Sequence, residues 1–213
     1  MKGHARILLA DDHDLVAQAF VALLEPHFTV VGTVSDGRAL IAKAQEIKPD
    51  VIVIDIGMPR LNGLDAGQKL KTMLPNTKFV VVTMNEAPEI AAEALRGWAS
   101  GYLLKKSAAS ELIKAIREVL KGGSYVTPRM AQHLVTRFMR DPDPEQTSKL
   151  SPRQREVLQL LAEGKNMRQV ARILGISART VAFHKYRIME EFNLRTSSDL
   201  LRLAIKQHIV GPV

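Results

Sequence analysis

The 213-residue sequence contains no cysteine. This absence excludes a disulfide framework, a cysteine nucleophile and a cysteine metal site, and it is compatible with a reducing compartment. The sequence also lacks any apolar run near the roughly 20 residues of a membrane-spanning helix, and acidic residues follow directly after the short apolar run near its N-terminus. We therefore expect a cytoplasmic protein with no signal peptide and no membrane partner.

Acidic residues are scarce only toward the C-terminal end. Residues 1–126 carry 15 Lys and Arg against 14 Asp and Glu, whereas residues 151–213 carry 11 against 5. The net charge of +8 therefore belongs mainly to the last segment. A basic surplus confined to one end favours a polyanionic partner such as nucleic acid, although charge alone is equally compatible with a solvated basic surface.

Short aliphatic runs alternate with amphipathic stretches through residues 5–121. Several runs are almost continuously hydrophobic, as in strands buried on both faces. They lie at 5–10, 29–34, 51–55, 78–83 and 101–104. The clearest helical stretch, 107–121, has Ser107 or Ser110 as a plausible N-cap. The alternation predicts an α/β domain with five parallel strands in a doubly wound sheet.

The pattern changes after residue 124. Residues 125–139 indicate a helix, residues 140–149 form a polar, proline-containing stretch typical of a linker, and the chain after Leu150 is helical throughout. We predict an α/β domain at 1–124, a linker with a helix at 125–148, and an all-α domain of four helices at 149–213.

Three acidic residues stand at the carboxyl ends of predicted strands: Asp11 and Asp12 after the first strand and Asp55 after the third. With the strand order 2-1-3-4-5 these strands are neighbours, and the carboxylates crowd at the edge where such sheets bind ligands. Mg²⁺ would relieve the repulsion, because it prefers oxygen ligands and often sits beside phosphate. Thr83 and Lys105 end the fourth and fifth strands and bring a hydroxyl and an ammonium to the same edge. A carboxylate fixed there can attack phosphorus.

Each of these residues alone has an ordinary explanation. A strand-end aspartate is usually an N-cap or turn residue, and a single threonine or lysine can be a cap or a solvated charge. All five at one sheet edge form a far more specific pattern, which favours phosphoryl chemistry.

Four segments together resemble the receiver domain of bacterial two-component response regulators, which has a flavodoxin-like fold. They are ILLADDHDLV (7–16), VIVIDIGMPRLNGLD (51–65), VVVTM (80–84) and GYLLKKS (101–107). The resemblance implies that Asp55 is the phosphoacceptor. It also implies that Asp12 ligates Mg²⁺ directly, that Asp11 helps through water, and that the carbonyl of Gly57 completes the protein ligands.

The same resemblance implies a switch. Thr83 would move to the phosphoryl group, the ring of Tyr102 would follow it inward, and Lys105 would bind a phosphoryl oxygen. Two positions depart from the family pattern: Lys106 replaces a frequent proline, and Trp98 stands where a glycine is common. Trp98 is either an ordinary core residue or an exposed contact for a partner.

The C-terminal domain has the pattern of a helix-turn-helix. Ser151 is a cap for the first helix with Pro152 at its first position, a second helix at 167–174 ends at Gly175, and Ser177 caps a third helix. Such a pair of helices suits the major groove of DNA. A helical docking domain with a solvated basic face is the alternative.

Residues 150–208 resemble the LuxR-type helix-turn-helix of the NarL/FixJ class of response regulators, which favours DNA binding. Candidate DNA contacts lie on the third helix: Arg179, Thr180, Ala182, Phe183, His184, Lys185 and Arg187. Ala182 stands where members often carry lysine, so the DNA target of relatives cannot be carried over. The last helix, at 197–210, either contributes to a dimer or only completes the small core.

The sequence as a whole favours a phosphorylation-dependent, DNA-binding transcription regulator rather than an enzyme. A sensor histidine kinase would phosphorylate Asp55 in the presence of Mg²⁺, and the phosphorylated form would bind double-stranded DNA as a homodimer. One alternative is a regulator that acts through receiver contacts without phosphorylation. Another is a phosphatase with an aspartyl nucleophile, which is disfavoured because Gly57 occupies the place of the usual second aspartate.

Overall fold

The computed structural model describes residues 4–140 and 150–211. These residues form two compact units, one made from most of residues 4–140 and the other containing residues 150–211. In the described part of the chain, no helix combines the length and the apolar character required to cross a bilayer.

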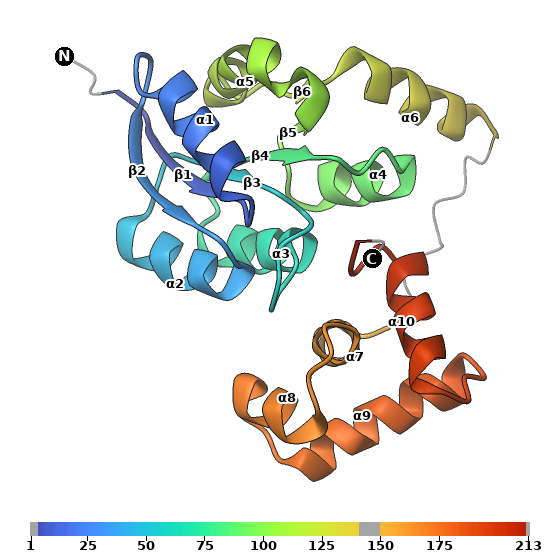
Figure 1. Ribbon diagram of the computed structural model, residues 1–213. Helices are drawn as coiled ribbons and strands as arrows, with labels where there is room; N and C mark the ends of the chain where they lie inside the picture. Colours follow the sequence, from blue (N-terminus) through green and yellow to red (C-terminus); the bar gives the residue numbers. More distant parts are fainter. Residues whose placement is uncertain (1–3, 141–149, 212–213) are drawn as a thin grey trace. The chain divides into compact units, whose positions relative to one another are not determined.

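The first unit is a parallel sheet between two layers of helices (Figure 1). The strands are β1 (Arg6–Ala10), β2 (Thr29–Val34), β3 (Val51–Ile54), β4 (Lys78–Thr83), β5 (Gly101–Leu104) and β6 (Tyr125–Val126). The helices are α1 (Asp14–Leu24), α2 (Gly37–Ile47), α3 (Gly63–Met73), α4 (Pro88–Gly97), α5 (Lys105–Leu120) and α6 (Pro128–Arg140). The strand order β2-β1-β3-β4-β5-β6 confirms the predicted doubly wound, flavodoxin-like order for the first five strands.

The sixth strand was not predicted, since the sequence indicated only a helix in this stretch. The amide of Tyr125 donates to the carbonyl of Ser100 at 3.1 Å, and the amide of Thr127 donates to the carbonyl of Tyr102 at 3.0 Å. This short strand therefore satisfies main-chain groups of β5 that would otherwise lie at an open edge. Only the tertiary position of the segment creates it, because two residues carry no strand pattern.

The helix α5 starts two residues before the predicted start at residue 107, and neither Ser107 nor Ser110 is its N-cap. The helix begins at Lys105, and its N-cap position has no side-chain cap. The hydroxyl of Ser107 donates to the carbonyl of Leu104 at 3.2 Å, and that of Ser110 donates to the carbonyl of Ser107 at 3.0 Å. These serines therefore bond to carbonyls within the helix and do not cap its free amides.

Both faces of the central strands are buried, as the continuous aliphatic runs predicted. Alternate residues such as Leu9, Val53 and Val80 pack with α1 and α5 in one cluster. Trp98 belongs to the core, where it is 5% exposed and its ring meets Phe79 edge-on with centroids 5.7 Å apart. The core interpretation of Trp98 is therefore the correct one.

The second unit contains four helices, as predicted: α7 (Pro152–Ala162), α8 (Met167–Leu174), α9 (Ala178–Glu191) and α10 (Ser197–Lys206). Ser151 and Ser177 cap α7 and α9 by accepting amide hydrogen bonds, and Gly175 ends α8 with a positive φ of 64°. The buried residues Leu200 and Leu203 of α10 pack with α7 and α9. The last helix therefore completes the core of the second unit.

Candidate functional site

The carboxyl ends of β1 and β3 hold two aspartates side by side. Ala10 is in register with Ile54, and the amide of Asp55 donates to the carbonyl of Ala10 at 2.8 Å. The amide of Asp11 donates to the carbonyl of Val34 on the other side at 3.0 Å. Because both residues continue paired, buried strands, their carboxylates are fixed by the sheet itself.

Four possible ligand groups gather at this point, which we call the acidic cluster: Asp11, Asp12, His13 and Asp55. One ligand atom from each lies within 4.8 Å of all the others. His13, which sequence analysis did not select, donates its amide to Asp11 Oδ1 at 2.9 Å, and its Nδ1 lies 3.0 Å from Asp12 Oδ1. Its position directly after the two aspartates was the available signal. The structure thus brings the three predicted carboxylates together and adds an imidazole.

Lys105 joins the acidic cluster from the end of β5. Its Nζ lies 2.7 Å from Asp11 Oδ2 and 2.7 Å from Asp55 Oδ2, and its side chain is only 9% exposed. Burial by itself lowers the pKa of Lys105, but attraction to Asp55 and hydrogen bonds to both aspartates outweigh it and raise the pKa. The ammonium is therefore charged and neutralises part of the negative charge.

The composition of the acidic cluster fits a hard divalent cation. Asp12 Oδ1 is buried and accepts no hydrogen bond in the described ranges, and its nearest charged or polar neighbour given by the structure is His13 Nδ1 at 3.0 Å. A buried carboxylate oxygen in this state favours a cation beside it. The amide of Gly57 donates to Asp55 Oδ1 at 3.3 Å, which places the loop after β3 beside the acidic cluster. Oxygen donors of this kind suit Mg²⁺.

Thr83 and Tyr102 meet at one loop residue, Asn85, which sequence analysis did not select. Thr83 Oγ1 accepts the amide of Asn85 at 3.2 Å, and the Tyr102 hydroxyl donates to the Asn85 carbonyl at 3.0 Å. Burial, together with the charge of Asp55, raises the pKa of Tyr102, so the hydroxyl keeps its proton. The loop between β4 and α4 is therefore held by both predicted switch residues.

The same loop is connected to α5 and α6 by ion pairs. Glu86 Oε1 lies 2.5 Å from Lys106 Nζ, and Glu86 Oε2 lies 3.0 Å from the guanidinium of Arg129. The hydrogen bond from Lys106 is the main cause that lowers the pKa of Glu86. Lys106, which stands where many receivers carry proline, thus has a structural contact next to the predicted switch residues.

The helix α9 carries the predicted DNA contacts on a largely exposed surface. Val181 and Ile188 are fully buried and fix the inner face of the helix. Arg179, Phe183 and Arg187 are exposed, and the others are intermediate: Thr180, Ala182, His184 and Lys185. Tyr186, which sequence analysis left out of its contact set, is 60% exposed on the same outer face.

His184 is one of the partly buried candidates. Its partial burial lowers its pKa, and the charges of Arg153 and Arg187 lower it further. These causes favour the neutral ring.

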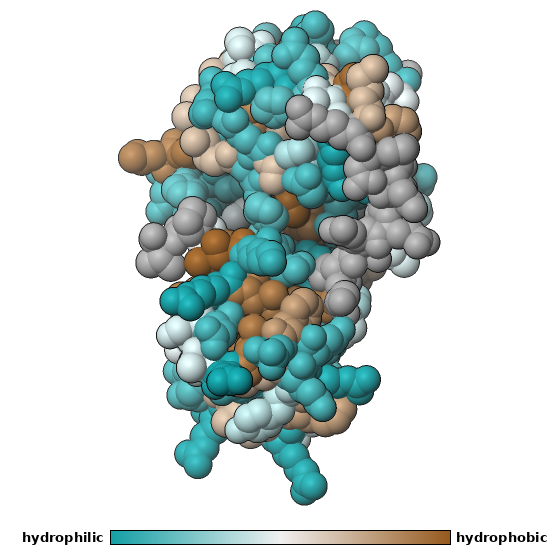
Figure 2. All heavy atoms as spheres, turned by 90° about the vertical axis from the view of Figure 1, so that its right-hand side faces the viewer, coloured by the Kyte–Doolittle hydropathy of each residue, from teal (hydrophilic) through white to brown (hydrophobic). Residues whose placement is uncertain are grey.

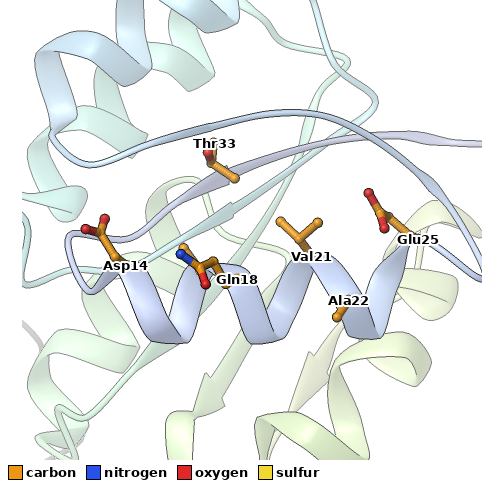
Figure 3. Close-up of a pocket in the computed structure, with 7 residues that line it drawn as sticks. Asp14, Gln18, Val21, Ala22, Glu25 and Thr33 are labelled. Atoms are coloured by element: carbon orange, nitrogen blue, oxygen red, sulfur yellow. The ribbon is translucent and has the colours of Figure 1, made fainter.

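An open pocket elsewhere on the first unit lies between α1 and β2 (Figure 3). Asp14 and Glu25 approach it from the two ends of α1, with Val21 and Thr33 between them. None of its lining residues belongs to the acidic cluster. The pocket therefore adds no group to the site described above.

Comparison with known proteins gives a family match for each unit. Residues 7–117 match the response regulator receiver domain, and residues 148–204 match the bacterial regulatory proteins of the luxR family. The oxygen regulatory protein NreC of Staphylococcus carnosus (strain TM300) is 34% identical, with 96% of this chain and 99% of the relative covered. The transcriptional regulatory protein YxjL of Bacillus subtilis (strain 168) is 35% identical over 98% of this chain and 99% of its own.

Solved structures show the same two-part organisation. A structure of the RcsB response regulator of Salmonella typhimurium has 28% sequence identity and a TM-score of 0.65, with 94% of this chain and 96% of that chain covered. A structure of the RcsB–DNA complex has 27% identity and a TM-score of 0.60, with 94% and 97% covered.

Proposed function

Because this chain belongs to the NarL/FixJ family of two-component response regulators, with a receiver domain and a LuxR-type DNA-binding domain, we propose that phosphorylation of Asp55 controls its binding to DNA. The observation that carries the proposal is the position of Asp55. Its carboxylate is fixed at the end of a buried strand, beside two further carboxylates and within 2.7 Å of an ammonium. Such a carboxylate is an oriented nucleophile with its counter-charges in place.

The phosphoryl donor would be a sensor histidine kinase that carries phosphohistidine. Asp55 attacks phosphorus, a bond forms between its oxygen and phosphorus, and the phosphorus–nitrogen bond of the donor breaks. The imidazole of the donor leaves with the electron pair of that bond and takes up a proton. The product is an acyl phosphate on Asp55, whose phosphoryl group carries about two negative charges near neutral pH in place of the single charge of the carboxylate.

Mg²⁺ would be held by Asp11, Asp12, Asp55 and the carbonyl of Gly57. When bound, it supplies positive charge that offsets the developing negative charge on the transferred group. The Oδ1 of Asp12, which is buried and accepts no hydrogen bond, supports this assignment. Lys105, released from Asp55 by the transfer, keeps its charge and contacts a phosphoryl oxygen.

The signal would leave the site through Asn85. Thr83 now accepts the amide of Asn85, and redirecting its hydroxyl to the phosphoryl group breaks this bond. The Tyr102 hydroxyl, which holds the Asn85 carbonyl, would then lose the loop conformation that it binds. Because Glu86 pairs with Arg129 of α6, a movement of this loop reaches the segment that precedes the DNA-binding unit.

On DNA, we propose a homodimer that reads two half-sites about one helical turn apart through α9, in the cytoplasm where the DNA lies. The net basic charge of residues 151–213, 11 cations against 5 anions, supports contact with phosphates. The RcsB relative has been solved as a complex with DNA.

The test uses the full chain with acetyl phosphate and Mg²⁺. Wild type and Asp14→Asn, whose aspartate lies next to the acidic cluster but outside it, should gain one phosphoryl group in intact mass. Both should also show a larger sedimentation coefficient and tighter binding to a selected DNA. Asp55→Asn should show none of these changes.

Two results would contradict the proposal. Equal DNA affinity and equal oligomeric state of Asp55→Asn and wild type in cells would favour a regulator that works without phosphorylation. Steady release of phosphate from small phosphoesters over many turnovers would favour the phosphatase.

A further inference from the structure

The outer face of α9 has an aromatic centre. Residues three, four and seven positions apart share one face of a helix, so Arg179, Phe183, Tyr186 and Glu190 form a row opposite the buried Val181 and Ile188. Phe183 is 58% exposed. The face of the molecule drawn in Figure 2 mixes hydrophilic and hydrophobic residues, and Phe183 is one of several large hydrophobic side chains exposed in the described ranges, with Tyr186 beside it at 60%.

The ring of Phe183 contacts two neighbours on the helix. The guanidinium carbon of Arg187 lies 6.0 Å from the centre of the ring, and the ring of His184 meets it edge-on with centroids 5.6 Å apart. Ala182, the preceding residue, has no long side chain that would keep a partner away from the ring. The protein therefore presents an exposed apolar ring beside positive charge.

The charge around the ring indicates what covers it. Arg179 and Arg187 flank Phe183 at four residues on either side, and Lys185 lies 5.8 Å from the ring of Tyr186. A phosphate backbone complements these cations, but a phosphate has no apolar group for the phenyl ring. Among the base-pair edges of the major groove, an apolar group is offered by the C5-methyl of thymine, and a modified cytosine offers the same methyl.

We propose that Phe183 determines sequence specificity by contact with the C5-methyl group of a pyrimidine in the major groove, in thymine or in 5-methylcytosine. This inference rests on the proposed function, because it requires that α9 enters the major groove. The inference goes beyond the proposed function by naming the residue and the chemical group that select the DNA target. In this chain, the apolar contact is made by Phe183, which directly follows Ala182, the position where relatives often carry a lysine.

The experiment measures methyl dependence on DNA that the protein itself selects. Wild-type full-length protein, activated with acetyl phosphate and Mg²⁺, selects duplexes from a random pool that contains thymine and 5-methylcytosine. The enriched pool is then copied in three ways: with thymine and cytosine, with uracil and 5-methylcytosine, and with uracil and cytosine. Affinities are measured by gel shift at one fixed salt concentration, because salt changes all of them.

We expect wild type to bind the copy without methyl groups more weakly than at least one methylated copy. Burial of one methyl group is worth roughly fourfold in affinity, so two half-sites give about 15-fold. The methylated copy that restores affinity identifies thymine or 5-methylcytosine as the source of the methyl group. Phe183→Ala should bind all three copies within about twofold of one another, and Phe183→Leu should keep part of the difference.

Tyr186→Ala is the matched control, since Tyr186 is equally exposed on the same face. This variant should keep the methyl dependence of wild type. Equal affinity of wild type for all three copies overturns the inference while DNA binding itself stands. The same methyl dependence in Phe183→Ala also overturns it, because another residue then reads the methyl. Failure of wild type to enrich any DNA would overturn the proposed function and this inference together.

Discussion

Replacement of Lys105 by methionine should destabilise the receiver domain and make its stability depend on Mg²⁺. The Nζ of Lys105 lies 2.7 Å from carboxylate oxygens of both Asp11 and Asp55. Methionine keeps most of the apolar length of the side chain but removes the ammonium. Two carboxylates, buried to about the same degree as the lysine, then face each other without their cation.

The size of the effect follows from burial. Removing one partner of a buried ion pair destabilises a protein by about 3–5 kcal/mol. Asp12 leaves one side of the acidic cluster partly open, with 29% of its side chain exposed. We therefore expect the lower end of that range, about 3 kcal/mol, which for a domain of this size lowers the melting temperature by roughly 10 °C.

The assay is thermal unfolding followed by tryptophan fluorescence. Trp98 is the only tryptophan of the chain, and it is buried against Phe79, so its emission reports the first unit alone. Mg²⁺ at about 100 times its dissociation constant from the Lys105→Met variant should raise the free energy of unfolding of that variant by roughly 2.7 kcal/mol. The same concentration should stabilise wild type less, because there the cation competes with the ammonium for the same carboxylate oxygens.

The adjacent lysine provides the control. Lys106 is also paired with a carboxylate, that of Glu86, but its side chain is 57% exposed. Lys106→Met should therefore change stability by no more than about 0.5 kcal/mol, with the same response to Mg²⁺ as wild type. Equal melting temperatures for the two lysine variants, or equal Mg²⁺ stabilisation of Lys105→Met and wild type, would refute the reasoning.

Three further predictions follow from single contacts. A Cβ at Gly67 would lie 2.4 Å from Trp98 Cζ3, so Gly67→Ala should lower the free energy of unfolding by about 1–3 kcal/mol, measured by urea unfolding followed by fluorescence. Gly97→Ala is the control, because a Cβ there meets nothing within 4 Å. Equal losses in the two variants would contradict the prediction. Ser151→Ala removes a capping box from α7 and should lower the stability of the second unit by about 1 kcal/mol, measured by circular dichroism; an unchanged transition would speak against the cap. Arg179→Ala should weaken binding to all DNA sequences alike and lower the slope of log affinity against log salt by about one, whereas an unchanged slope would place Arg179 away from the phosphates.

Several features could be predicted because they depend on neighbouring residues in the chain. The strands at 29–34, 78–83 and 101–104 have the predicted bounds. The second and third are buried on both faces, as a continuous aliphatic run predicts, whereas the first lies at the sheet edge and is only partly buried. The caps at Ser151 and Ser177 follow from a side chain that reaches an amide two or three residues away. The gathering of aspartates at one edge was predicted on the condition that the strand order is 2-1-3-4-5, and the observed sheet has this order for its first five strands.

Other features depended on residues that are distant in sequence. Asp55 meets Asp11 only because β3 pairs with β1 across 44 residues of chain, with Ala10 in register with Ile54. Asn85 became the shared partner of Thr83 and Tyr102 because β4 and β5 lie side by side. In the same way, β6 exists because β5 offers main-chain partners, a property that its own two residues do not encode.

The sequence by itself thus determined the elements, their order and the kinds of chemical group at the sheet edge. Only the tertiary structure decided that one ammonium is shared equally by two carboxylates, and that Trp98 fills the space above a glycine. The physical reason is range: propensity, capping and hydrophobic periodicity act over a few residues, whereas ion pairing and packing require segments far apart in the chain to be brought within a few ångströms.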